Sequence, residues 1–321
     1  MALADNIRIA VKVCKLYYAD DLSQKEISSQ LGISRPQVSR ILAYARANNL
    51  VTVTINNPYA DEAGYEQMLT ERYGLQDALV LESNPLKDET HIERFGSLAA
   101  QNLDAYITDN ACVGVMSGQT ISSVVHSITR FERRGLEVVP LVGGLGSTGV
   151  IWQANVIAQR LAECSGGSFH TLNAPVVVRS RELREKLSSE LGIESILQKG
   201  SRCGICMIGI GEVDISSTNV RAGALTKTDI DELKKAGAVA SLCTSYLDFT
   251  GQIVETSISD RSIGQTLHSI KKSKVIAFAI DPKKARAIHA ALSSGFIDVF
   301  FTDLETARAI DKCDSKQEDS L

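Results

Sequence analysis

The 321-residue chain contains no uninterrupted apolar run of about 18 residues, which is the length that a membrane-spanning helix needs. Its first residues, MALADNIRIAVKV, lack the basic start and the unbroken apolar block of a secretory signal. Seven cysteines, an odd number, are scattered along the chain, which favours reduced thiols over a disulfide framework. We therefore expect a cytoplasmic protein that has no membrane partner.

The motifs of common catalytic and metal sites are also missing. The five histidines show no metal-binding spacing such as HExxH, and neither a GxSxG motif nor a P-loop is present. Cys203 and Cys206 form a CxxC motif, but it lies in an apolar, strand-like stretch that would point the two thiols to opposite faces. A second pair for zinc is missing as well. We expect these cysteines to be buried, and we expect no metal and no cofactor.

What the chain does have is an uneven distribution of charge. The net charge is −4, but residues 1–57 hold seven Lys or Arg against four acids, so this part carries +3 and the remainder −7. A basic head on an acidic body suits a nucleic-acid-binding module attached to a domain that does not touch nucleic acid. Because +3 is little charge for neutralising phosphates, we expect two or more heads in a homodimer or homotetramer.

The stretch LSQKEISSQLGISRPQVSRILAYAR, residues 22–46, predicts two short helices joined by a tight turn. Ser23 and Glu26 have the spacing of a capping box, and Gly32 suits a left-handed residue that ends a helix. Ser34 can cap the second helix, and Pro36 is tolerated in its first turn. A helix over residues 6–19 completes a three-helix head. These features together predict a helix-turn-helix.

The second helix of the pair has one apolar stripe and one polar side. In a helix-turn-helix the polar side enters the major groove, where Arg can bond guanine and Gln can bond adenine. We predict that Arg35, Gln37 and Arg40 read bases and that Ser34 binds a phosphate of double-stranded operator DNA. The alternative is an ordinary helical hairpin with a solvated polar face. The predicted DNA-binding residues are Ser34, Arg35, Gln37, Ser39, Arg40 and Tyr44.

The pattern changes at the turn residues Asn56, Asn57 and Pro58, so we place a boundary between a DNA-binding domain, residues 1–57, and an effector-binding and oligomerisation domain, residues 58–321. A β-branched run at 50–55 predicts a strand before it. Beyond it, helices near 62–73, 88–109 and 151–164, and another from Thr120, alternate with apolar strands. This alternation predicts an α/β, Rossmann-like, doubly wound and mostly parallel sheet. The predicted strands are 78–81, 112–116, 137–142, 170–178, 203–210, 237–243, 274–280 and 297–301.

Three loops of the predicted sheet are candidates for holding a ligand, because ligands of open α/β sheets lie beyond the carboxyl ends of the strands. Residues 117–120 combine a glycine, free helix-start N–H groups and a Thr hydroxyl, which suits a phosphate. Residues 143–149 hold four glycines, and the next helix carries Gln153. Lys284 follows the strand at 274–280 and can meet a phosphate as a point charge. A plain strand-to-helix turn, a flexible turn and a solvated lysine are the respective alternatives.

These residues together resemble the SorC (SorC/DeoR) family of bacterial transcriptional regulators. In the head the resemblance rests on LYYADDLSQKEISSQLGISRPQVSRIL. In the body it rests on VGVMSGQTI, VVPLVGGLG, QANVIAQRLA, NAPVVV, GIG, AGALT, DFTGQIV, KKARAIHAAL and TDLETA. The resemblance implies an effector domain related to sugar-phosphate isomerases and deaminases (NagB/RpiA-like), a phosphorylated sugar or polyol as effector, and control of a carbohydrate catabolic operon.

The resemblance also implies roles for particular residues. Gly118, Gln119 and Thr120 would hold the phosphate, and Gln153 and Lys284 would complete the pocket. Some members of the family place a basic residue at the position of Val142, so a Schiff base or a second phosphate contact there, and hence a bisphosphate ligand, is not expected. The full predicted effector-binding set is Gly118, Gln119, Thr120, Gly143, Gly144, Gln153, Asp248 and Lys284.

Two other functions compete with an effector-responsive regulator. A sugar-phosphate isomerase or deaminase with an accessory DNA-binding head would need a base near the pocket, for which Asp248 and Asp281 are the candidates. A sigma-like factor would share the head but would not explain the body. The regulator explains both parts of the chain, and we therefore expect no enzyme activity.

Overall fold

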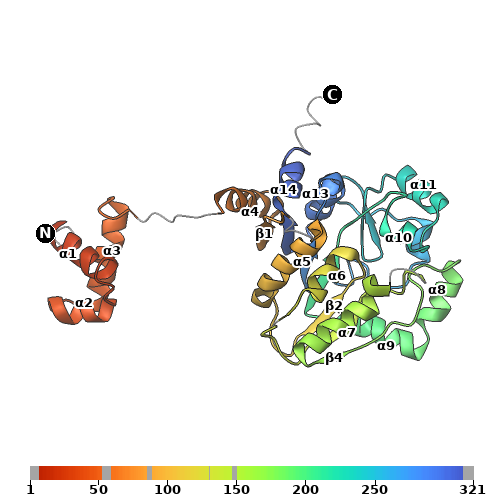
Figure 1. Cartoon of the computed structure of the whole chain (residues 1–321), viewed down its shortest axis with the longest axis horizontal. Helices are drawn as coiled ribbons and strands as arrows, with labels where there is room; N and C mark the ends of the chain where they lie inside the picture. The colour runs from red at the N-terminus through yellow and green to blue at the C-terminus, as the bar shows by residue number, and fades with distance from the viewer. Residues whose placement is uncertain (1–6, 53–58, 85–88, 130, 147–149, 314–321) are drawn as a thin grey trace. The chain divides into compact units, whose positions relative to one another are not determined.

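The computed structural model describes residues 7–52, 59–84, 89–129, 131–146 and 150–313 (Figure 1). The chain divides into two compact units, Met1–Pro58 and Tyr59–Leu321. This division lies one residue from the boundary expected from the turn at 56–58. No helix among the described residues has the length and apolarity to cross a bilayer.

The first unit is a bundle of three helices, α1 (Ile7–Tyr18), α2 (Gln24–Leu31) and α3 (Arg35–Ala47). The capping box forms as predicted, because the Ser23 N–H donates to Glu26 Oε2 at 2.8 Å and the Glu26 N–H donates to Ser23 Oγ at 3.3 Å. Gly32 ends α2 with φ 65°, in the left-handed region that favours glycine. The three helices bury one common core, formed by Ala10, Val13, Cys14, Leu16, Ile27, Val38, Ile41, Leu42 and Ala45.

The strand predicted at 50–55 is not formed in its described part. Leu50, Val51 and Thr52 are outside any strand, and residues 53–55 lie outside the described residues. Leu50 and Val51 instead pack against the core of the helical unit. These apolar side chains therefore cover a helix bundle. A local alternation of apolar residues does not distinguish this role from that of a strand.

The second unit is built on a seven-stranded sheet with the order β1-β10-β9-β5-β2-β3-β4. All of its strand pairs are parallel, which confirms the predicted α/β class. A small antiparallel sheet, β6-β7-β8, follows β5. The strands are β1 (Asp77–Leu81), β2 (Cys112–Val115), β3 (Glu137–Pro140), β4 (Ser168–Phe169), β5 (Ile205–Gly209), β6 (Gly211–Glu212), β7 (Ala240–Leu242), β8 (Ser245–Leu247), β9 (Lys274–Phe278) and β10 (Val299–Asp303).

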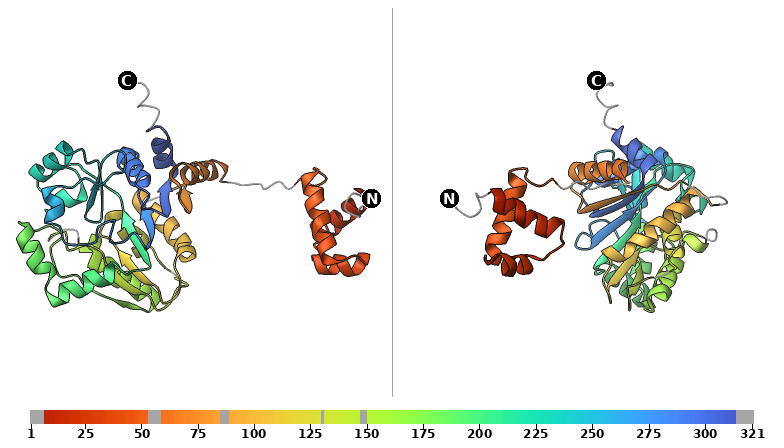
Figure 2. Two further views of the ribbon diagram at one scale, coloured as in Figure 1. Left: turned by 180° about the vertical axis from the view of Figure 1, so that it is seen from behind. Right: turned by 60° about the vertical axis from the view of Figure 1, so that its left-hand side comes forward.

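Helices cover both faces of the parallel sheet (Figures 1 and 2). Since crossovers between parallel strands are right-handed, α5, α6 and α7 lie on one face and α9 and α13 on the other. The helices of this unit are α4 (Ala60–Tyr73), α5 (His91–Asn102), α6 (Gln119–His126), α7 (Ala154–Ser165), α8 (Arg181–Ser188), α9 (Leu191–Gly200), α10 (Thr218–Arg221), α11 (Lys227–Lys235), α12 (Ser257–Asp260), α13 (Ala285–Ser293) and α14 (Leu304–Asp311). Short 3-10 turns are η2 (Leu103–Tyr106), η3 (Val150–Trp152) and η4 (Pro282–Lys284).

Three predicted elements differ from the structure. The strand expected at 170–178 is not formed: β4 ends at Phe169, just before it, and Pro175 and Val177 make only isolated bridges to Gly144 and Ser262. The segment 237–243 forms β7, which belongs to the antiparallel sheet and not to the main one. The helix expected at 88–109 ends at Asn102 and continues as η2. In each case tertiary pairing decides the element, because an apolar run alone specifies neither its partner nor its length.

Candidate functional site

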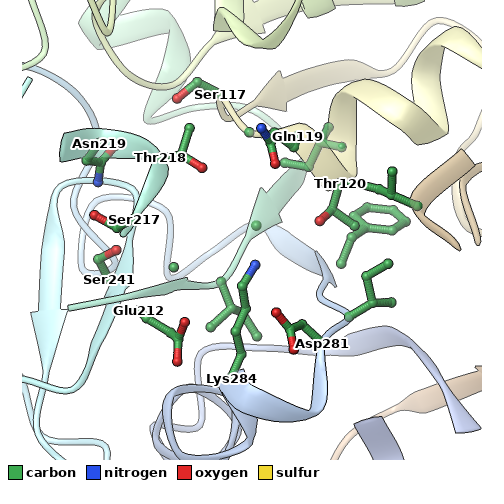
Figure 3. Close-up of a pocket in the computed structure, with 18 of the residues that line it drawn as sticks. Ser117, Gln119, Thr120, Glu212, Ser217, Thr218, Asn219, Ser241, Asp281 and Lys284 are labelled. Carbon is green, nitrogen blue, oxygen red and sulfur yellow. The ribbon is translucent and has the colours of Figure 1, made fainter. Parts of the chain in front are cut away.

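A cavity of about 560 Å³ lies beyond the carboxyl ends of β2, β5 and β9 in the second unit. The chain leaves these neighbouring strands through the loop to α6, the turn into β6, and η4. Because these three connections leave the same edge of the sheet, residues from distant parts of the sequence meet there. Figure 3 shows Gln119 and Thr120 on one side of the cavity, Ser217, Thr218 and Asn219 on another, and Lys284 reaching in between them.

The N-terminus of α6 opens into this cavity without a side-chain cap. Gly118 precedes the helix, and its N–H donates to the Trp152 carbonyl oxygen at 3.0 Å, which anchors the loop. The backbone N–H groups of residues 119–121 have no hydrogen-bond acceptor among the described residues. Three free donors and the positive end of a helix dipole therefore face a space that an anion can enter.

Lys284 is held by a local turn at the end of β9. Its backbone N–H donates to the Asp281 carbonyl oxygen at 2.9 Å, and the Asp281 carboxylate accepts from the Lys283 N–H at 3.0 Å. Asp281 has φ 106°, a conformation that costs energy for a residue other than glycine. The Asp281 N–H donates to the hydroxyl of the fully buried Thr306 at 2.9 Å, which helps to hold this conformation. The Lys284 ammonium makes no hydrogen bond or ion pair with any described residue, and it points into the cavity (Figure 3).

The opposite wall is rich in groups that bond hydroxyls. Glu212 on β6 lies near Lys284; burial raises the pKa of its carboxyl above the usual range, and the Lys284 charge acts in the opposite direction. Asn219 on α10 also lines the cavity, and Arg221 of the same helix places its guanidinium 5.7 Å from the centre of the Trp152 ring. One end of the cavity therefore suits an anion and the other suits a polyol.

Four of the predicted effector residues lie together at this cavity: Gly118, Gln119, Thr120 and Lys284 all line it. The other four are placed elsewhere. Gly143 and Gly144 pack against the backbone of residues 174–176, and a Cβ on Gly143 would lie 2.5 Å from the Ala174 carbonyl oxygen. Gly143 is therefore required for a close approach of two chain segments, and neither glycine lines the cavity.

Gln153 and Asp248 hold turns. The Gln153 side chain accepts from the Leu145 N–H at 2.9 Å and donates to the Gly146 carbonyl oxygen at 3.1 Å, so it fastens the segment after β3. The Asp248 carboxylate accepts from the Thr250 N–H and hydroxyl and from the Gln252 N–H. Neither side chain lines the cavity. Of the two candidate bases for the enzyme alternative, only Asp281 lies there.

Several residues of the cavity were not predicted from the sequence, among them His91, Glu212, Asn219 and Arg221. The segment that leads into α10 could have been recognised from its sequence, because Ser-Ser-Thr-Asn at 216–219 is a polar cluster shortly after a strand. His91 and Glu212 carried no such signal, since each stands alone in its local sequence.

The second candidate site is the exposed side of α3. Arg35, Ser39 and Arg40 are exposed, and Ser34 caps the helix start. Gln37 is half-buried, and its Oε1 accepts from the Ser34 N–H at 2.8 Å and from the Ser34 hydroxyl at 3.0 Å. Its amide NH₂ is then the part that remains to bond a base.

The position of Tyr44 differs from the expectation that it lies on the polar side of α3. Its half-buried side chain packs against the core of the three-helix unit, so it does not lie fully on the polar side. Its ring is partly used to cover the apolar stripe, as the amphipathic body of a tyrosine allows.

Comparisons with known proteins agree with both units. The sugar-binding domain family matches residues 57–310, and region 4 of sigma-70 matches residues 12–48. The deoxyribonucleoside regulator of Bacillus subtilis (strain 168) is 31% identical over 308 residues, which cover 94% of this chain and 97% of that protein. The chain belongs to the SorC/DeoR family of transcriptional regulators.

Further relatives also match this SorC-family chain along most of its length. The sorbitol operon regulator of Klebsiella pneumoniae is 26% identical, with 97% of this chain and 99% of that protein covered. The full-length crystal structure of that regulator has a TM-score of 0.72 at 23% identity and covers 95% of this chain and 99% of that one, which shows the same fold. A DeoR family regulator from Listeria monocytogenes has a TM-score of 0.71 at 26% identity, covering 78% of this chain and 99% of that one.

The resemblance seen in the sequence is thereby confirmed, and the chain is a helix-turn-helix transcriptional regulator with a sugar-binding domain. The relatives are named as regulators of sugar-related operons. The match of the head to a sigma-70 region concerns residues 12–48 alone, whereas the relatives match both units.

Proposed function

We propose that this regulator controls a carbohydrate catabolic operon in response to a phosphorylated sugar or polyol bound in the cavity at the ends of β2, β5 and β9. The observation that carries the proposal is the uncapped start of α6, whose free N–H groups share the cavity with the unpaired Lys284 ammonium. A phosphate satisfies these donors and the charge together. The hydroxyl-bonding wall near Glu212 and Asn219 suits the sugar part.

DNA is bound by the head in this proposal. The exposed Arg35 and Arg40 and the free amide NH₂ of Gln37 contact base edges, and Ser34 at the helix start contacts a phosphate. A head charge of +3 is small for the phosphate contacts that operator binding requires, which supports a homodimer or homotetramer. The effector regulates because its affinity differs between two arrangements of that oligomer.

The test begins with an operator selected from random DNA by the purified full-length protein. Gel-shift titrations then compare phosphorylated sugars and polyols with the same compounds lacking phosphate. We expect only phosphorylated compounds to change operator affinity. A change caused equally by the unphosphorylated compounds would contradict the phosphate part of the proposal. Non-cooperative binding with one head per operator would contradict the oligomer.

Two variants connect the response to the cavity. Lys284→Ala removes the ammonium, and Thr120→Val removes the hydroxyl of a buried threonine that lines the cavity. We expect both to abolish the effector response while operator binding without effector is unchanged. Lys283→Ala is the matched control, because this neighbouring lysine is exposed and does not line the cavity. Retention of the full response in Lys284→Ala would refute the assignment.

A further inference from the structure

His91 is a cavity-lining residue whose position is set by two partners outside the cavity. It is the first residue of α5, and its ring lines the same cavity as Gln119 and Thr120. Its Nε2 lies 2.6 Å from the hydroxyl of the buried Ser83 and 3.0 Å from Asp303 Oδ2. The ring is therefore held by its Nε2 edge. Its Nδ1 has no hydrogen-bond partner among the residues that the structure describes.

Asp303 is an unusual partner because it is 1% exposed at the end of β10. Its Oδ1 accepts from the Thr306 N–H at 2.6 Å, which caps α14. Its Oδ2 makes no regular hydrogen bond, and the contact at ion-pair distance is with His91. A buried carboxylate oxygen that lacks a regular hydrogen bond gains from a donor beside it, so Asp303 helps to fix the Nε2 edge of the His91 ring.

The same network also holds Lys284. Thr306 bonds Asp303 through its N–H, and its hydroxyl accepts from the Asp281 N–H at 2.9 Å. The Asp281 carbonyl oxygen in turn accepts from the Lys284 N–H at 2.9 Å. The ends of β9 and β10 therefore connect His91 and Lys284 through short hydrogen-bonded steps. One buried carboxylate thus contributes to the position of two basic side chains of the cavity.

We propose that His91 is a further contact for the anionic group of the effector and that Asp303 is its positioning residue. This inference rests on the proposed function, because it concerns the same cavity. Ser83 and Asp303 hold the ring by its Nε2 edge, so a proton on Nδ1 is available to donate to a phosphate oxygen. The phosphate is held by backbone N–H groups from α6, by Lys284 from η4 and by His91 from α5.

The experiment is an NMR titration of the full-length protein with inorganic phosphate, after labelling the backbone with ¹⁵N and the five histidines at their imidazole rings. The amide signals of Gln119 and Thr120 report the anion at α6, and the His91 ring signal reports the proposed contact. We expect all three to shift with one common dissociation constant. The ring of His268, which is exposed and lies outside the cavity, is the internal control and does not shift.

Variants test the inference through the affinity of the protein for phosphate. We expect His91→Gln to weaken phosphate binding roughly tenfold, as the loss of one charge-assisted hydrogen bond does, and His268→Gln to leave it unchanged. Asp303→Asn, which keeps a cap for α14, is expected to weaken phosphate binding and to move the His91 ring signal before phosphate is added. If Asp303 acts through His91, the double variant His91→Gln, Asp303→Asn binds phosphate as weakly as His91→Gln alone, whereas additive losses would contradict the positioning role.

The possible failures are distinct. Amide shifts at Gln119 and Thr120 with a silent His91 ring and an unchanged affinity of His91→Gln would overturn this inference and leave the proposed function standing. Absence of amide shifts with phosphate and with every phosphorylated sugar tested would overturn both.

Discussion

Replacing Gln153 by methionine separates two roles for this residue, since the family resemblance implies a ligand contact and the structure shows a clamp on a turn. Methionine keeps the length of the side chain and removes both hydrogen bonds, the one accepted from the Leu145 N–H and the one donated to the Gly146 carbonyl oxygen. Each such bond contributes about 0.5–1.5 kcal/mol, so the loss is about 1–3 kcal/mol in the free energy of unfolding. The Leu145 side chain is buried, which places the effect towards the upper part of that range.

The assay is urea unfolding of the full-length protein, followed by effector titration of the folded variant. We expect a lower urea midpoint at an unchanged slope, together with a melting temperature lower by about 2–4 °C for each kcal/mol lost. Effector affinity is expected to change by less than about threefold, because removing a direct charge-assisted contact costs much more.

Gln159→Met is the matched control on the same helix. Its side chain bonds only the exposed Glu163, one turn later, so the variant is expected to lose less than about 0.5 kcal/mol. If Gln153→Met were as stable as the control but lost the effector response, the clamp interpretation would be refuted and the ligand contact restored.

Three further predictions follow from local contacts. Ser23→Ala removes the cap of α2, costs about 1 kcal/mol and accelerates amide hydrogen exchange within α2; unchanged exchange would contradict it. The Cys112 thiol, 3.4 Å from Cys203, has its pKa lowered by that contact, whereas the contact and burial raise the pKa of Cys203. Iodoacetamide is therefore expected to modify Cys112 at lower pH, and mass spectrometry showing equal rates would disprove this. Because burial raises the folded-state pKa of Glu212, its ionisation costs stability increasingly as the pH rises from the unfolded-state pKa, and the cost is complete above the folded-state pKa. Glu212→Gln is therefore expected to raise the melting temperature at pH 7, with a gain that shrinks towards pH 4.

The helix-turn-helix could be predicted almost completely from the sequence, because its determinants are local. Ser23 and Glu26 cap each other across three residues, and Gly32 ends its helix by its own backbone conformation. The apolar stripe of α3 needs only helical periodicity to be recognised. The position of Tyr44 could not be predicted, because a tyrosine at the border of the apolar stripe can either pack against the core or face solvent.

In the body, the sequence alone determined the alternation of strands and helices and pointed to the Gly118–Thr120 loop, which lines the cavity. It did not determine which loops meet, because that follows from the order β1-β10-β9-β5-β2-β3-β4, and sequence neighbours such as β1 and β2 are not spatial neighbours. Of the described part of the glycine-rich segment after β3, Leu145 lines the cavity and Gly143 and Gly144 do not, and Glu212 and His91 were overlooked. A single carboxylate or imidazole acquires its role from burial and partners, and these exist only after the sheet has assembled.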